Sequence, residues 1–193
     1  GGMSHIIGVG VGMGGIIDSD RGIIYYSIPL HLSVPMNFSS ILSEQLNIPI
    51  MIGNDANCCA WGELAFHKAD GLKNFIFSLI QFRSGDISRQ EYGGVGVGFG
   101  LVIDSNVYTG VNYTAGEFRS AYWIDGNKAQ FSIPYEEIKD VIIRSDLMDR
   151  FVQELSRNIA LFVNTFNLNR VFIGGDIENY DVDVPEIMNR EIS

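Results

Sequence analysis

The stretch IPIMIGNDANCCAWGELAF, Ile48–Phe66, decides the fold. An apolar run of strand type ends at Gly53 and passes through Asn54 and Asp55 into a segment of helical character. Asn and Asp are favoured N-caps, because their side-chain oxygens accept the free N–H groups of the first helical turn. Asp55 can alternatively face a ligand hydroxyl in a cleft. The stretch therefore predicts a buried strand that leads directly into a helix, and it leaves both interpretations open.

Strands and helices alternate on both sides of this junction, which favours an α/β or α+β fold with a mixed sheet. The expected strands are His5–Val11, Gly22–Ile28, Ile48–Ile52, Asn74–Phe82, a hairpin with its turn at Asp104–Asn106, and Arg170–Asp176. The expected helices are Asn37–Leu46 with Asn37 as its cap, Asp55–Asp70 closed by Gly71, and Asp146–Phe166. The polar stretch Arg83–Tyr92 is expected to be an exposed loop, and no function is assigned to it.

Composition excludes several classes of protein. The 193 residues are 46% hydrophobic, which is enough for a sizeable core and unlike a disordered chain. No apolar run is long enough to span a membrane, and the first residues do not resemble a signal peptide. A net charge of −10 disfavours direct contact with nucleic acid. The adjacent Cys58 and Cys59 are expected to be reduced packing residues, which predicts a cytoplasmic protein.

Three glycine clusters follow apolar segments: GVGMGG (10–15), GGVGVGFG (93–100) and IGGD (173–176). Glycine lets backbone N–H groups approach a ligand closely, although bulges and tight turns need glycine too. None of the clusters is a P-loop, because no Gly-Lys-Ser/Thr follows. Their recurrence favours a cleft lined by backbone.

Glu117, in YTAGEFRSAYW, stands in a mostly apolar setting, where it is either a surface residue or a ligand-facing acid. The histidines His5, His31 and His67 lie far apart without carboxylates at metal-ligand spacing. They are expected to be packing or surface residues.

In this order, GVGMGGIID, GNDANCCAWGE, GGVGVGFGLVIDSNVYTGVNYTAGEF and RVFIGGD resemble the ROK family (repressors, open reading frames and sugar kinases) over roughly Ile6–Asp176. The resemblance implies an α/β, actin/hexokinase-like (ribonuclease H-like) fold with mixed sheets flanked by helices, present as a truncated chain. It also implies the remainder of a first half-domain at residues 1–52 and a second half-domain at 53–193. An N-terminal winged helix-turn-helix is expected to lie outside this sequence.

The family's site residues transfer to matching positions of this chain. The resemblance implies sugar binding by Gly15, Asn54, Asp55 and Glu117, with Asp55 as general base only in a kinase. It implies nucleotide-loop-like roles for Gly94, Gly96, Gly98, Gly174 and Gly175.

Several departures disfavour nucleotide chemistry. Where the family has Gly-His, this chain has Arg119-Ser120, and no cysteine follows Cys59, so the family's zinc site is missing and no metal is expected. Arg119 either replaces the lost histidine or has no role in binding. Val95 replaces a phosphate-loop threonine and has no hydroxyl. The N-terminal Asp-Gly-Gly-Thr-type phosphate loop and the closing helices are expected to lie beyond the two ends of this sequence.

Sugar-side residues without the phosphate side predict the sugar-sensing domain of a ROK-type transcriptional regulator of the xylose or N-acetylglucosamine repressor kind. Such a domain needs no cofactor, is not an enzyme, binds a monosaccharide, contacts DNA only through the N-terminal domain, and forms homo-oligomers away from membranes. The alternative is a truncated ATP-dependent sugar kinase of the glucokinase or N-acetylmannosamine kinase type, which uses Mg-ATP. A third possibility is a fragment that binds no sugar and serves self-association.

Overall fold

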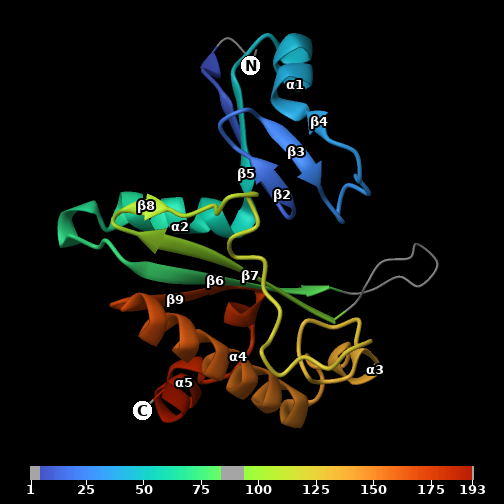
Figure 1. Ribbon diagram of the computed structural model, residues 1–193, viewed down its shortest axis with the longest axis vertical. Coiled ribbons are helices and arrows are strands. Elements are labelled where there is room, and N and C mark those ends of the chain that lie inside the picture. Colours follow the sequence, from blue (N-terminus) through green and yellow to red (C-terminus); the bar gives the residue numbers. More distant parts are fainter. Residues whose placement is uncertain (1–4, 84–93, 193) are drawn as a thin grey trace.

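The computed structural model describes residues 5–83 and 94–192, and Figure 1 shows that they form two lobes. The first lobe carries β1 to β5 and α1, and the second carries a four-stranded sheet between helices. From residue 84 onward, the loop expected at Arg83–Tyr92 lies outside the described residues. No helix in the described ranges is long and apolar enough to cross a membrane.

The first lobe holds two small sheets. Strands β1 (Val9–Met13) and β5 (Ile50–Asn54) pair in parallel. Strands β2 (Ile16–Asp18), β3 (Ile23–Tyr26) and β4 (Met36–Asn37) pair antiparallel in that order. Their buried residues form one core cluster: Ile17, Ile24, Ile50 and Ile52.

The sequence pattern places most of this lobe correctly. The first strand runs over Val9–Met13 rather than from His5 to Val11, and the short strands β2 and β4 were not predicted. Helix α1 (Phe38–Leu46) begins as predicted, because the Asn37 side chain accepts the N–H of Ser40 at 3.0 Å.

The second lobe is a sheet in the order β8-β7-β6-β9, built from β6 (Phe75–Arg83), β7 (Gly94–Ile103), β8 (Asn106–Val107) and β9 (Arg170–Gly175). Strand β6 is central: it pairs antiparallel with β7 and parallel with β9. Side chains alternate between the two faces of a strand. Phe75 and Phe77 accordingly pack on the α2 side, and Ile76 and Ile80 pack in the cluster that contains α4.

Helices cover both faces of this sheet (Figure 1). Helix α2 (Asp55–Phe66) lies on one face, and α4 (Ser145–Phe166) and α5 (Val184–Ile192) lie on the other. A short helix, α3 (Tyr135–Ile138), precedes α4. The apolar stripe predicted from Asp146 to Phe166 is confirmed as the buried face of α4 as far as Ile159, whereas Phe166 at its end is exposed.

Two predicted element boundaries are described more closely by the structure. The helix expected to run to Asp70 ends at Phe66, and a 3₁₀ turn, Lys68–Asp70, continues to Gly71, whose φ of 66° closes it. The predicted hairpin joins β7 to β8 through Asp104 and Ser105, whose φ values of 49° and 64° are typical of a type I′ turn.

Candidate functional site

Asn54, the last residue of β5, links helix α2 to the turn between β1 and β2 through its carboxamide. Its Oδ1 accepts the N–H of Asn57 at 3.1 Å, which confirms that Asn54 is the N-cap. Its Nδ2 donates to the carbonyl of Gly15 at 3.2 Å. One donor hydrogen and one acceptor lone pair remain for another partner. The cap and a ligand contact are therefore compatible.

Gly15 and Gly14 bring bare backbone to this junction. Gly15 has a φ of 148°, and a Cβ there would lie 2.3 Å from the carbonyl oxygen of Tyr26, so a side chain would clash. A Cβ on Gly14 would lie 3.5 Å from Asp55 Oδ2. The Asp55 carboxylate therefore faces the turn between β1 and β2.

Asp55 is the first residue of α2, and its side chain is half-buried. Its Oδ1 accepts the N–H of Ala56 at 2.9 Å. The helix N-terminus carries a partial positive charge, which stabilises a carboxylate at this position. Oδ2 is the oxygen directed toward Gly14 and available to a ligand.

Glu117 approaches from the second lobe. The carbonyl of Gly116 accepts the N–H of Phe99 in β7 at 2.9 Å. Gly116 has a φ of 92°, and a Cβ there would lie 1.9 Å from the Phe99 carbonyl oxygen, so only glycine fits. This contact fixes the backbone beside Glu117 against β7.

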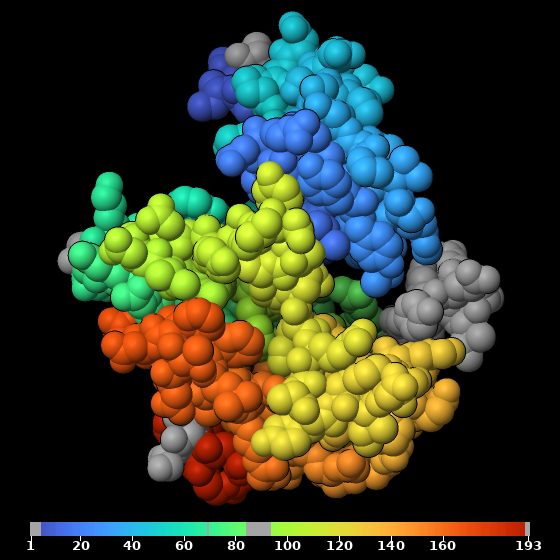
Figure 2. Space-filling view, viewed as in Figure 1, coloured from blue at the N-terminus to red at the C-terminus, as the bar shows by residue number. Residues whose placement is uncertain are grey.

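Asp55 and Glu117 share an environment. Desolvation raises the pKa of the Glu117 carboxyl, and the negative charge of Asp55 raises it further. The side chain is nevertheless exposed to water. Glu117 pairs with Gly98 of β7, and a Cβ on Gly98 would touch Ala56 at 3.4 Å, so Glu117 lies near the first turn of α2. Figure 2 shows the surface hollowed between the blue first lobe and the second lobe.

The arrangement suits a ligand rich in hydroxyl groups. Two carboxylates and a carboxamide present acceptors close to the turn at Gly14 and Gly15. Ionised carboxylates only accept hydrogen bonds, so their partner must be a donor. Within residues 5–83 and 94–192, no group of three His, Cys, Asp or Glu side chains could hold a metal ion.

Comparison with known proteins places these residues in a family. The ROK family profile matches residues 2–119, more than half of the chain. The chain belongs to the ROK family. Its fold is the actin/hexokinase-like fold of the family's solved kinases, of which it covers only part.

Individual ROK relatives include both kinases and regulators. The chain is 26% identical to a glucokinase of Halalkalibacterium halodurans, over 90% of this chain and 62% of that protein. It is 30% identical to a xylose repressor of Bacillus spizizenii, over 58% of this chain and 25% of that protein. A solved ROK family transcriptional regulator, a homologue of the E. coli MLC protein, superimposes with a TM-score of 0.67 at 18% identity, covering 96% of this chain and 52% of that one. The chain thus spans less than two thirds of the curated relatives.

The glycines implied for nucleotide binding gather at one end of the second-lobe sheet. Gly98 in β7 and Gly174 in β9 flank the same β6 residue, Leu79. Gly96 faces the guanidinium of Arg83, with a contact of 3.3 Å to a Cβ placed there. The two clusters are thus brought together on either side of β6.

Packing alone also explains several of these glycines. A Cβ on Gly98 would touch Ala56 of α2 at 3.4 Å. Gly175, with a φ of 102°, lies so close to Ile80 that a Cβ would be 2.3 Å from its carbonyl oxygen. The remaining glycine of the group, Gly94, begins β7 with a φ of 100°. Their nucleotide role in this ROK chain stays a prediction.

Arg119 is engaged by an aromatic ring. Its guanidinium carbon lies 4.3 Å from the centre of the Trp123 ring, a cation–π contact. The Trp123 indole N–H donates to the carbonyls of Asn127 and Ala129, both at 3.0 Å. Trp123, to which the sequence assigned no function, therefore anchors the loop before α3 and holds Arg119.

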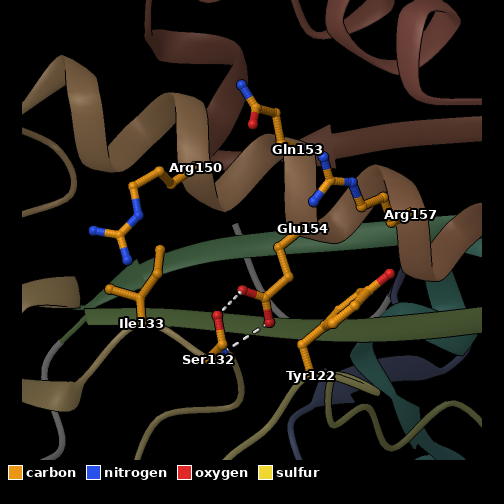
Figure 3. A pocket seen from close by; sticks show the side chains of 7 residues that line it. All are labelled: Tyr122, Ser132, Ile133, Arg150, Gln153, Glu154 and Arg157. Carbon is orange, nitrogen blue, oxygen red and sulfur yellow. Dashed lines mark hydrogen bonds between the residues drawn. The ribbon is translucent and has the colours of Figure 1, made fainter.

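A separate cavity lies beside α4. It measures about 380 Å³ and is lined by Tyr122, Ser132, Ile133, Arg150, Gln153, Glu154 and Arg157 (Figure 3). Glu154 is buried and accepts the Ser132 N–H at 2.7 Å and its hydroxyl at 2.5 Å. Arg157 pairs with Glu191 at 2.8 Å. These charges are satisfied within the protein, so the cavity is a structural groove and the Asp55–Glu117 hollow remains the candidate site.

Two residues near the hollow were missed from sequence. Asp18, at the end of β2, is fully buried, and Tyr113 has a positive φ of 60°. An acid directly after the apolar pair Ile16-Ile17 was an available signal for Asp18. A tyrosine in a conformation that favours glycine gives no sequence signal at all.

Proposed function

We propose that this chain is the sugar-sensing part of a ROK-type transcriptional regulator and binds a monosaccharide without phosphorylating it. The observation that carries this proposal is the convergence of Asn54, Asp55 and Glu117 on one hollow. Polar groups paired with substrate hydroxyls discriminate strongly between ligands through hydrogen bonds, without any need for chemistry.

Sugar recognition divides among these groups. Asp55 Oδ2 and the Glu117 carboxylate accept hydrogen bonds from hydroxyl groups. Asn54 contributes its remaining N–H, while its two internal bonds hold the carboxamide in place. Gly14 lies beside Asp55 Oδ2, and its backbone is the part of this turn nearest to the proposed sugar contacts.

Features of the second lobe favour sensing over phosphoryl transfer. Phosphoryl transfer depends on positioning and charge neutralisation at the phosphates. Val95 in β7 offers no hydroxyl for that purpose, and Arg119 is stacked on Trp123. Any contact with DNA is assigned to a helix-turn-helix outside this acidic chain. We also expect a cytoplasmic homo-oligomer.

A sugar kinase is the second candidate, because the similarity to a glucokinase extends over 90% of this chain. In that case Asp55 removes the proton from the acceptor hydroxyl, and Mg-ATP is the donor. The position of Asp55 close to Glu117 and Gly14 is equally compatible with this role.

Calorimetric titration with a panel of monosaccharides tests the proposal. We expect one class of sugar to bind, and Asp55→Asn or Glu117→Gln to weaken binding by about tenfold or more, since each leaves donors on the sugar without a charged partner. Asp104→Asn, in the exposed β7–β8 turn, is a matched control and should bind normally.

A parallel assay with Mg-ATP separates the two functions. Phosphorylation of any hexose that disappears in Asp55→Ala would establish the kinase and overturn the sensor. Absence of heat with every sugar would instead favour the third possibility, a self-association fragment.

A further inference from the structure

Tyr113 stands in a backbone conformation that tyrosine rarely adopts. Its φ is 60°, in the left-handed region, where a bulky side chain is strained and glycine is not. Such strain persists only where surrounding contacts hold the residue in place, and it is frequent at functional sites. The ring must therefore make contacts that compensate for its backbone.

The first contact is an aromatic stack across the two lobes. The ring centres of Tyr113 and Tyr25 lie 5.8 Å apart with their planes inclined by 18°. Tyr25 belongs to β3 of the first lobe. The separation lies in the range in which stacked aromatic rings attract one another.

The second contact is with Asp18. Asp18 pairs with Ile23, and alternate residues of a strand share a face, so Asp18 and Tyr25 lie on the same side of the β2–β3 sheet. A hydrogen-bonding interaction with Asp18 is the main cause that raises the pKa of the Tyr113 phenol. Asp18 is buried, and its Oδ2 has no hydrogen-bond partner among the described residues, so this oxygen is free to accept a hydrogen bond.

The loop that carries Tyr113 also carries Glu117. On the side of the second lobe, the N–H of Tyr108 donates to Leu101 at 2.8 Å, and Gly116 is bonded to Phe99. Between these points the loop turns toward the first lobe, and Figure 2 shows the yellow-green residues after β8 against the blue lobe. A bond from the N–H of Glu117 to the carbonyl of Thr114 at 3.1 Å ties Glu117 to the residue after Tyr113.

We propose that Tyr113 is a positioning residue, which locks the Glu117 loop onto the β2–β3 sheet and thereby sets the width of the sugar-binding hollow. This inference rests on the proposed function of that hollow. Tyr113 acts through Glu117 and through the spacing of the lobes. Without the lock, Glu117 samples positions too far from Asn54 and Asp55, and only a fraction of molecules is competent to bind.

The backbone of Tyr113 makes a sharp test possible. In Tyr113→Gly the ring is lost but the conformational strain is relieved, so the loop is not disrupted. We expect its dissociation constant for the sugar that the wild-type chain binds to rise about three- to tenfold, the equivalent of one lost aromatic contact. Tyr113→Phe keeps the stack and should recover most of the affinity. Asn112→Gly adds the same backbone freedom at the preceding residue and should bind the sugar like the wild type.

A double-mutant cycle distinguishes positioning from a general effect on stability. Tyr25→Ala should weaken binding similarly, and adding Tyr113→Gly to it should produce little further loss, because both changes remove the same contact. The melting temperature of each variant, measured without sugar, should not follow the changes in affinity.

The outcomes separate the inference from the proposed function. If the wild-type chain binds a sugar and Tyr113→Gly binds it equally well, or if the two losses simply add, the positioning role is refuted and the sensor stands. If the wild-type chain binds no sugar, the proposed function fails and the positioning role fails with it.

Discussion

Replacing Asn54 with alanine should remove two hydrogen bonds from the junction between the lobes. One is the N-cap bond from the N–H of Asn57 at 3.1 Å, and the other is the bond to the carbonyl of Gly15 at 3.2 Å. Loss of an N-cap costs about 0.5–2 kcal/mol, and loss of a further partly buried bond costs about 1 kcal/mol. The free energy of unfolding should therefore fall by about 1.5–3 kcal/mol.

Asn37 provides the matched control for this measurement. It caps α1 through a single bond at 3.0 Å and is exposed. Asn37→Ala should cost only about 1 kcal/mol, the price of one exposed cap. Asn54→Asp should fall between the two, because a carboxylate keeps the cap but has no hydrogen to donate to Gly15.

Urea unfolding followed by circular dichroism measures all three variants against the wild type. The midpoints are comparable if the slopes are unchanged. Equal costs for Asn54→Ala and Asn37→Ala would refute the reasoning, because Asn54 would then be a cap and nothing more. Its link to the glycine turn would carry no energy.

Two further predictions concern Glu117. The pKa of its carboxyl, measured by ¹³C NMR, should lie above the usual 4.5. Asp55→Asn should lower this pKa, because the charge of Asp55 contributes to the shift. An unchanged pKa would mean that the two acids do not share a hollow. A folded pKa above the unfolded one gives stability that is present below the unfolded pKa and lost as pH rises through the folded pKa. As the pH rises through that interval, Glu117→Gln should therefore become more stable relative to the wild type. A stability difference between the two proteins that does not change with pH would contradict this. Gly116→Ala should lower the melting temperature strongly, because its Cβ would lie 1.9 Å from a carbonyl oxygen. Gly126→Ala should have a much smaller effect, because φ is also positive there, at 83°, but nothing lies within 4 Å of the added Cβ. Equal effects would show that the backbone strain of a positive φ, and not the clash, determines the loss.

The sequence predicts this fold well where periodicity and capping agree. The continuous apolar run from Phe75 is explained by β6, which is buried on both faces. The stripe of α4 and the cap at Asn37 follow from spacing and residue type. Strand β2 was not predicted, because it has only three residues and follows directly on a glycine cluster. Three residues are too few to show an alternating pattern.

Only part of the candidate site can be predicted from the sequence in the same way. Asn54 and Asp55 stand at a strand-to-helix junction, so local rules and family resemblance both point to them. Neither local rules nor family resemblance points to Tyr113. Its proposed role depends on a contact with Tyr25, which lies in the other lobe and 88 residues earlier in the chain. Single-sequence patterns carry local geometry, and such a long-range contact is fixed only when the two lobes fold against each other.

The unequal surroundings of the two acids explain how a pair of carboxylates can share a hollow. Asp55 sits at a helix N-terminus and accepts the Ala56 N–H, so its negative charge is locally compensated. Desolvation raises the pKa of Glu117, and repulsion from the Asp55 charge raises it further. A ligand that donates hydroxyl hydrogens to both relieves this repulsion, whereas an anionic ligand would increase it. The same electrostatics therefore favour a neutral polyol in the hollow and disfavour a sugar phosphate or a free carboxylate.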